Sequence, residues 1–320
     1  MVHPMLNQHH AYTNGVRLHY VEQGTGPLVL LCHGWPESWY SWRHQIEALA
    51  NAGYRVVAPD QRGYGTSDAP HAVDAYGILD LVGDLVGLVH ALGEEKAIII
   101  GHDWGSMVAA PAALLRPDIF RAVGLLSVPY IPRRAVRPAT RFEAMSQKRH
   151  FYQAYFQPVG HVERELEEDY RKTILGVLYT ASGDWPGHGF AVFDKSTRLV
   201  DNLAIPEELP VWLTEADIAR YVEQFRTSGF RGPINWYRNM DRNWATTAFL
   251  DGAKLSQPTI FIAGEKDGVL KIAAEEFEAL ERNVPNLTKK VVIPAAGHWI
   301  QQERPSEVSD LLISFLRGLD

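Results

Sequence analysis

The sequence predicts an α/β fold in which a mostly parallel, doubly wound sheet is covered by helices on both faces. First, short apolar runs alternate with longer amphipathic ones, which is the order of βαβ units. Second, the short runs are rich in β-branched residues and lack a period of two, as expected of strands buried on both faces. Third, one long stretch with helical periods, from Pro129 to about Ala245, interrupts this alternation.

The elements before the interruption follow in chain order. A strand is expected at each short apolar run, and a helix at the amphipathic stretch that follows it. The predicted strands are Pro27–Cys32, Tyr54–Ala58, Ala97–Ile100 and Ala122–Ser127, and the predicted helices are Trp42–Ala50, Ile78–Leu92 and Gly105–Leu115.

The inserted stretch is rich in aromatic and charged residues and contains no clear strand run. Its predicted helices are Arg149–Gln157, Val162–Leu175 and Thr214–Thr227, the last of which opens with the capping pattern Thr-Glu-Ala-Asp. After it, the predicted strands are Thr259–Ala263 and Lys290–Ile293, and the predicted helices are Lys271–Arg282 and Ser306–Leu316. We therefore predict one α/β domain, residues 1–128 and 246–320, interrupted by a helical segment, residues 129–245.

Composition and charge exclude several classes of function. The net charge of −7 comes without a basic block, so neither nucleic acid nor an anionic membrane is an expected partner. Cys32 is the only cysteine, which excludes an internal disulfide, and its apolar surroundings predict a buried, inert thiol. No apolar stretch reaches the roughly 18 residues of a membrane span, and residues 1–10 lack the layout of a signal peptide. A soluble, cytoplasmic protein is expected.

Motifs that would bind a cofactor are missing. Gly63-Tyr64-Gly65 lacks the later glycine of a dinucleotide-binding loop and is expected to form a turn. There is no phosphate-binding loop with a Gly-rich Lys motif, and the histidines show no H-E-x-x-H spacing. We expect no cofactor and no metal.

Four predicted strand ends carry residues suited to catalysis, and functional groups collect at such ends in open α/β sheets. The four stretches are His33–Pro36, His102–Trp104, Asp267 and Gly297-His298. Asp103, Asp267 and His298 follow the nucleophile, acid, histidine order of the α/β-hydrolase layout. Asp103 stands where a G-x-S-x-G elbow would present its serine. Each residue alone has an ordinary role as a helix cap or turn former, but their joint placement favours a catalytic triad.

An aspartate at the elbow changes the chemistry. A carboxylate with an unperturbed pKa of about 3.9 is ionised at neutral pH and can attack without a base. It can displace a leaving group from a saturated carbon and form an alkyl ester, which water then opens at the carboxyl carbon. His298, oriented by Asp267, would be the general base for this water. The backbone N–H groups of Trp35 and Trp104 would stabilise the resulting oxyanion.

The leaving group is left open by this chemistry. Release of a halide needs donors for an anion, whereas opening of an epoxide needs an acid that protonates the oxygen. A tyrosine hydroxyl is protonated at neutral pH and can donate to that oxygen. The inserted segment offers several tyrosines, between which composition does not choose: Tyr152, Tyr155, Tyr170, Tyr179, Tyr221 and Tyr237.

Six stretches carry a family resemblance. They are HGWPES (33–38), DQRGYG (60–65), GHDWG (101–105), FYQAYFQ (151–157), NWYRN (235–239) and GHW (297–299). Through them the whole chain resembles the soluble epoxide hydrolases of the α/β-hydrolase superfamily. The first three recur across several α/β-hydrolase families, whereas the two in the inserted segment are much more specific.

The resemblance implies an α/β-hydrolase fold with a helical cap (lid) domain at residues 129–245, and a pocket between cap and core. It also implies two tyrosines that bind and protonate the epoxide oxygen, which by motif position are Tyr152 and Tyr237. Trp35 stands where the family more often has phenylalanine, but only its backbone N–H is needed there. The expected partners are a small apolar epoxide and water. The oligomeric state, a homodimer included, stays open.

Two other classes of function are weighed against this one. A haloalkane dehalogenase would use the same Asp-His-Asp chemistry, but it would carry a side-chain amide where Trp35 stands and would lack the tyrosine pair. A fluoroacetate dehalogenase would carry an arginine where Trp104 stands. A non-catalytic binding protein on this fold is disfavoured by the complete set of chemical residues.

Overall fold

The structure, a computed structural model, describes residues 6–319 and is built on an eight-stranded sheet. In spatial order the strands are β1 (Asn7–Thr13), β2 (Val16–Gln23), β4 (Arg55–Pro59), β3 (Leu28–Cys32), β5 (Ala97–His102), β6 (Phe120–Leu126), β9 (Thr259–Gly264) and β10 (Leu287–Ile293). Strands β4 to β10 pair in parallel, whereas β1 pairs with β2, and β2 with β4, in antiparallel fashion. The predicted α/β fold class is confirmed.

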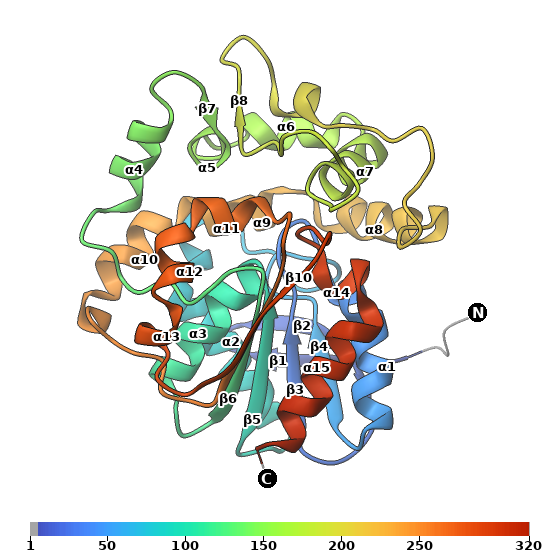
Figure 1. The fold of residues 1–320 in the computed structure, drawn as a ribbon, viewed down its shortest axis with the longest axis vertical. Coiled ribbons are helices and arrows are strands. Elements are labelled where there is room, and N and C mark those ends of the chain that lie inside the picture. The colour runs from blue at the N-terminus through green and yellow to red at the C-terminus, as the bar shows by residue number, and fades with distance from the viewer. Residues whose placement is uncertain (1–5, 320) are drawn as a thin grey trace.

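Helices cover both faces of this sheet (Figure 1). Helix α1 (Arg43–Asn51) packs against α15 (Pro305–Arg317) on one face, and α2 (Ile78–Ala91) packs against α3 (Trp104–Leu115) on the other. Successive side chains of β3 therefore enter different cores: Val29 and Leu31 join the first, and Leu30 joins the second. Burial on both faces explains why the strand sequences show no alternation of apolar and polar residues.

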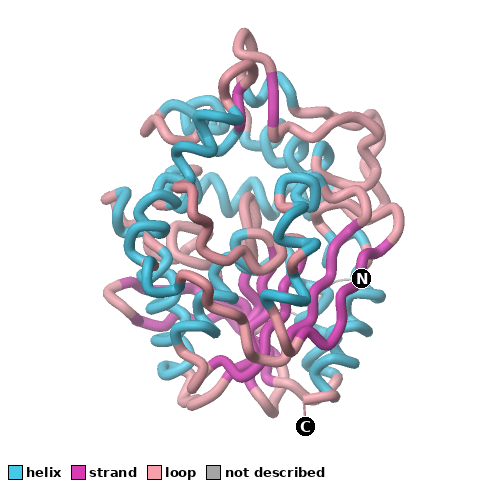
Figure 2. The backbone as a smooth tube through the Cα atoms, turned by 60° about the vertical axis from the view of Figure 1, so that its left-hand side comes forward, coloured by secondary structure: helices cyan, strands magenta, loops and turns pink. Residues whose placement is uncertain are grey.

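The chain between β6 and β9 forms a mainly helical layer above the sheet (Figure 1). Its elements are α4 (Pro138–Met145), β7 (His150–Phe151), α5 (Tyr152–Tyr155), α6 (His161–Glu167), α7 (Tyr170–Thr180), β8 (Val192–Phe193), α8 (Glu215–Ser228), α9 (Arg231–Arg238) and α10 (Met240–Thr246). Figure 2 shows the short pair β7–β8 at the top of the molecule, apart from the main sheet. Helix α8 begins after Thr214, whose hydroxyl accepts from the backbone N–H of Asp217, so its predicted start is confirmed.

The remaining helices are short. They are η1 (Trp39–Trp42), η2 (Val73–Tyr76), η3 (Leu199–Asn202), η4 (Ala248–Leu250), α11 (Gly268–Ile272), α12 (Ala274–Glu278), α13 (Leu280–Asn283) and α14 (Ile300–Glu303). Within residues 6–319, no helix combines the length and apolarity that crossing a membrane requires. The prediction that residues 1–10 are not a signal peptide falls partly outside the described range, which begins at residue 6.

Three predicted helices are wrong in detail. The prediction at 149–157 becomes β7 followed by the single turn α5, and the prediction at 162–175 is split into α6 and α7. Asp169 causes the second break, because its side chain caps α7 by accepting from the N–H of Lys172. The prediction at 271–282 is divided among α11, α12 and α13. The pair β7–β8 also contradicts the expectation of an insertion without strands.

Candidate active site

Asp103 lies in the sharp turn between β5 and α3. Its backbone has φ 52° and ψ −117°, a left-handed conformation that is strained for a side-chain-bearing residue. The turn is so tight that it leaves no room for side chains on either side of Asp103. A Cβ on Gly101 would lie 2.1 Å from the Gly105 carbonyl, and a Cβ on Gly105 would lie 1.9 Å from the Cys32 oxygen. Glycine is therefore required on both sides, and the turn presents the Asp103 carboxylate at the end of the sheet.

The structure brings the three predicted triad residues together. His298 Nδ1 lies 3.1 Å from both carboxylate oxygens of Asp267, and His298 Nε2 lies 3.6 Å from Asp103 Oδ2. The first distance fits a hydrogen bond and the second is an ion-pair distance. Asp267 is itself fixed, because its Oδ1 accepts from the N–H of Val269 at 2.9 Å. The imidazole is thus placed between two carboxylates.

The charges of this group stabilise one another. Burial alone would raise the pKa of Asp103, but His298, His102 and the Trp35 N–H outweigh it, so that this pKa lies below its ordinary value. Burial alone would lower the pKa of His298, but Asp267 and Asp103 outweigh it and raise that pKa well above its ordinary value. At neutral pH the free site therefore holds an ionised Asp103 beside an imidazolium.

One of the two expected backbone donors is hydrogen-bonded to the Asp103 carboxylate. The Trp35 N–H donates to Asp103 Oδ1 at 2.9 Å. Trp104 is the first residue of α3, where backbone N–H groups have no acceptor inside the helix and carry the positive end of its dipole. Gly34 lets the two strand ends approach, since a Cβ there would lie 2.4 Å from the Asp103 Cβ.

Tyr152 and Tyr237 are the two tyrosines of the helical layer that meet near Asp103. Their ring centroids are 5.8 Å apart, and the Tyr237 ring lies 5.0 Å from that of Trp104. The other four have partners elsewhere: Tyr155 donates to Glu165, Tyr170 stacks on Phe230, Tyr179 lies against Trp185, and Tyr221 donates to Gln302. The structure thus separates the six tyrosines that composition could not.

Both tyrosines keep their protons at neutral pH. Burial, together with the nearby Asp103, raises the pKa of Tyr152 above its ordinary value, despite hydrogen bonds from Gln153 and Tyr237 that lower it. Burial, with Tyr152 and Asp103, likewise raises the pKa of Tyr237 well above its ordinary value. The Gln153 side-chain amide donates to Tyr152 Oη at 2.9 Å, which leaves the Tyr152 proton free to be donated.

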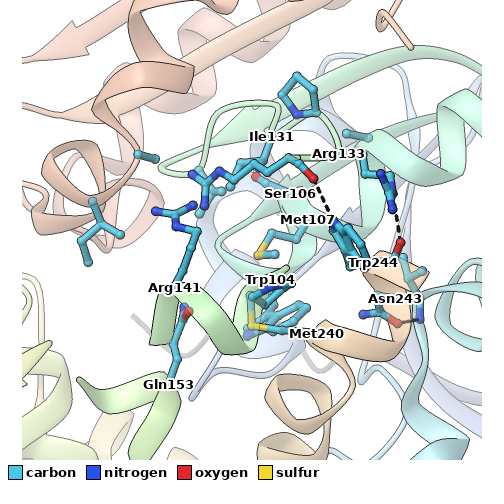
Figure 3. Close-up of a pocket in the computed structure, with 18 of the residues that line it drawn as sticks. Trp104, Ser106, Met107, Ile131, Arg133, Arg141, Gln153, Met240, Asn243 and Trp244 are labelled. Carbon is cyan, nitrogen blue, oxygen red and sulfur yellow. Dashed lines mark hydrogen bonds between the residues drawn. The ribbon is translucent and has the colours of Figure 1, made fainter. Parts of the chain in front are cut away.

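A cavity of ≈ 240 Å³ opens beside Asp103. Figure 3 shows Trp104, Met107 and Met240 across its centre, with Arg141 and Gln153 on one side and Arg133 and Trp244 on the other. Asp103 and Tyr152 also line it, and most of its wall is apolar. Such a cavity suits a small apolar ligand held beside a few polar groups. Among the described residues, no group of three or more His, Cys, Asp or Glu side chains could hold a metal ion.

Sequence reasoning missed a buried polar network beneath the site. His102 Nδ1 lies 2.7 Å from Glu37 Oε2, and His102 Nε2 lies 2.7 Å from the backbone oxygen of His298. Glu303 accepts from the N–H groups of Gly297 and Trp299, on either side of His298. The stretches HGWPES and GHDWG contain Glu37 and His102, but only the fold shows that the two side chains meet.

The fold and this site define a protein of the α/β-hydrolase class. A family model described as alpha/beta hydrolase fold matches residues 27–156. Epoxide hydrolase A of Mycobacterium tuberculosis is 45% identical over 312 residues, which cover 96% of each chain.

Two solved structures agree with this similarity. An epoxide hydrolase from an endophytic Streptomyces superposes with a TM-score of 0.96 at 48% identity, over 98% of this chain and 96% of that one. Epoxide Hydrolase A from Mycobacterium thermoresistibile superposes with a TM-score of 0.94 at 45% identity, over 99% of both chains. The chain belongs to the epoxide hydrolases of the α/β-hydrolase superfamily.

Proposed function

We propose that this protein hydrolyses epoxides to vicinal diols through a covalent ester on Asp103. Membership of the epoxide hydrolases supports the reaction, and the meeting of Tyr152 and Tyr237 near Asp103 is the observation that carries the proposal for this chain. A ring opening needs a carboxylate and a proton donor on opposite sides of the epoxide. The elbow supplies the carboxylate, and the tyrosines of the helical layer supply the donors.

In the first step, Asp103 attacks an epoxide carbon and the carbon–oxygen bond of the ring breaks. Asp103 Oδ1 accepts from Trp35, so Oδ2 is the oxygen free to form the new bond. The departing alkoxide takes a proton from Tyr152 or Tyr237, and the tyrosinate that remains regains a proton from solvent. The largely apolar wall of the cavity favours substrates with an apolar body.

In the second step, water attacks the ester carbon of Asp103. Once Asp103 is esterified, His298 loses one of the two carboxylates that raise its pKa, so this pKa falls and His298 gives up its proton to solvent. The neutral imidazole takes a proton from the attacking water and returns it to the diol oxygen as that oxygen leaves. The regenerated Asp103 carboxyl group then passes the second proton of the water to His298, which restores the ion pair. The N–H groups of Trp35 and Trp104 stabilise the charge that develops on Oδ1.

The domain organisation is part of this proposal. We assign residues 1–128 and 246–320 to a core that carries the triad, and residues 129–245 to a cap that carries the tyrosines. The substrate would then bind where the two meet. A cytoplasmic location stays a prediction from the sequence, and the oligomeric state, a homodimer included, stays open.

One experiment tests the covalent route. Excess enzyme converts an epoxide in ¹⁸O-labelled water for a single turnover, and mass spectrometry locates the label. The proposal expects unlabelled diol and label in the Asp103 carboxylate, because the diol receives its new oxygen from Asp103. Label in the diol of the first turnover would contradict the ester. Halide release from haloalkanes, with no diol from any epoxide, would instead favour the dehalogenase.

A further inference from the structure

Arg238, the residue after Tyr237, is held in the interior by an unusually full set of partners. Its side chain is 3% exposed and forms a bidentate ion pair with Glu163, at 2.5 and 2.9 Å. Burial alone would raise the pKa of Glu163, but the hydrogen bonds from Arg238 contribute to lowering it, so the pair is charged. Arg238 Nη1 also donates to Asn235 Oδ1 at 2.9 Å.

The other Arg238 donors hold the segment that carries Tyr152. Arg238 Nε donates to the carbonyl oxygens of Phe156 at 3.0 Å and Gln157 at 3.2 Å, and Nη2 donates to that of Pro158 at 2.9 Å. These carbonyls directly follow α5, the single helical turn that begins with Tyr152. The acceptor groups at the end of this turn are therefore satisfied by a side chain of α9.

A second contact joins the same two segments, with the donor on the α5 side and the acceptor on α9. Gln157 Nε2 donates to the backbone oxygen of Tyr237 at 3.2 Å and to that of Gln153 at 2.8 Å. Arg238 and Gln157 thus join the two tyrosine-bearing segments at two points.

Helix α9 is fixed independently of this joint. Trp236 Nε1 donates to the Arg62 carbonyl at 3.1 Å, and Asn239 Nδ2 donates to the Val73 carbonyl at 2.6 Å. Arg62 lies in the loop after β4, and Val73 is the first residue of η2. Arg238 therefore connects the short α5 segment to a helix that is already anchored.

We infer that Arg238 is a positioning residue that sets the separation of the Tyr152 and Tyr237 hydroxyls, and thereby the rate of epoxide ring opening. The effect on the rate of ring opening rests on the proposed function, whereas the effect on the separation of the two hydroxyls does not. The hydrogen-bond partners of the Arg238 side chain belong to the helical layer and include none of the three triad residues, so we expect hydrolysis of the ester to be independent of it.

The test compares the two chemical steps in Arg238→Met, Arg238→Lys and Glu163→Gln. Rapid-quench mass spectrometry follows the ester as it forms and decays in a single turnover. Arg238→Met should slow ester formation about tenfold to a hundredfold, because small displacements of reacting groups slow a reaction by factors of this size. Ester hydrolysis should change less than about twofold. Arg238→Lys, which keeps the charge and part of the hydrogen bonding, should recover part of the rate, and Glu163→Gln should have an intermediate effect.

Arg55→Met is the matched control. Arg55 forms two ion pairs, with Glu22 at 2.7 Å and Glu94 at 2.9 Å, and its side chain is 22% exposed. Its partners Glu22, Leu92 and Glu94 lie outside the two tyrosine segments. This variant should lower the melting temperature without changing the ratio of the two rates. If Arg238→Met slows both steps equally, or leaves ester formation unchanged, the positioning role is wrong.

A measurement without turnover separates this inference from the proposed function. Fluorotyrosine is incorporated, and the ¹⁹F signals of Tyr152 and Tyr237 are assigned with the Tyr→Phe variants. Arg238→Met should shift or broaden both signals, whereas Arg55→Met should leave them in place. Unmoved signals in Arg238→Met overturn the inference. A wild-type protein that opens no epoxide contradicts only the proposed function.

Discussion

Replacement of Asp103 by asparagine should lower the pKa of His298. Asparagine is nearly the same size as aspartate but uncharged, and it therefore reproduces the charge that Asp103 has once it is esterified. In the free protein Asp267 and Asp103 flank the imidazole on its two nitrogens and together raise its pKa well above the ordinary value. When the Asp103 carboxylate is removed, burial still lowers the pKa of His298, and of the two carboxylates only Asp267 is left to raise it.

The structure gives the size of the lost interaction. Opposite unit charges at the 3.6 Å separation of His298 Nε2 and Asp103 Oδ2 attract by about 5 kcal/mol at an effective dielectric constant of about 20. Asp267, at 3.1 Å, supplies a similar amount and is retained. Since about 1.4 kcal/mol corresponds to a tenfold change in a proton-binding constant, the loss is large enough to change the protonation state of His298.

The assay is a pH titration of ¹⁵N-labelled histidine by NMR, with His298 assigned by its absence in His298→Gln. We expect the His298 midpoint to lie at lower pH in Asp103→Asn than in the parent. In the parent protein, hydrolysis of the Asp103 ester should speed up as pH rises through the pKa that His298 has beside the esterified residue, because the base is neutral above that pKa. An unchanged or raised midpoint in Asp103→Asn would refute the electrostatic coupling.

Three further outcomes can be checked. Tyr152→Phe and Tyr237→Phe should each slow ester formation, by about a hundredfold for loss of a general acid, and the double variant should nearly abolish it; normal rates in the double variant, by rapid quench, would exclude the tyrosines as acids. His298→Gln should accumulate the ester, seen as a mass increase of the intact protein, and full turnover would disprove the base. Gly105→Ala should cost about 1–3 kcal/mol in thermal unfolding, because its Cβ would lie 1.9 Å from the Cys32 oxygen; an unchanged melting temperature would contradict this.

The fold was predictable for strands that are buried on both faces of the sheet. The runs at 28–32, 97–102 and 120–126 are buried strands of the central sheet, and apolar composition alone marks them. Strand β1 was missed because most of its residues are exposed, so it carries no apolar run. The helices at 162–175 and 271–282 failed for a different reason. Their periodicity is helical, and periodicity does not report breaks such as the one that the Asp169 cap makes between α6 and α7.

The meeting of the candidate triad residues was predictable from the sequence. The contacts of the side chains around them were not. Strand order and the elbow turn bring Asp103, Asp267 and His298 to one end of the sheet, and both features leave a pattern in the sequence. Glu37 and His102 also meet there, but 65 positions separate them and nothing local relates them. The same holds for the contact of Arg238 with α5, which depends on how two distant helices pack.

The 3.6 Å separation between Asp103 and His298 orders the two steps of the proposed reaction. While Asp103 is ionised, it and Asp267 both raise the pKa of His298 and so disfavour the neutral imidazole that can remove a proton from water. The charge of His298 in turn lowers the pKa of Asp103 against the effect of burial, and so favours the ionised nucleophile. Alkylation of Asp103 removes its charge, and the pKa of His298 then falls. In the proposed reaction the base is therefore favoured after the nucleophile has been consumed, and this coupling needs no movement of the chain.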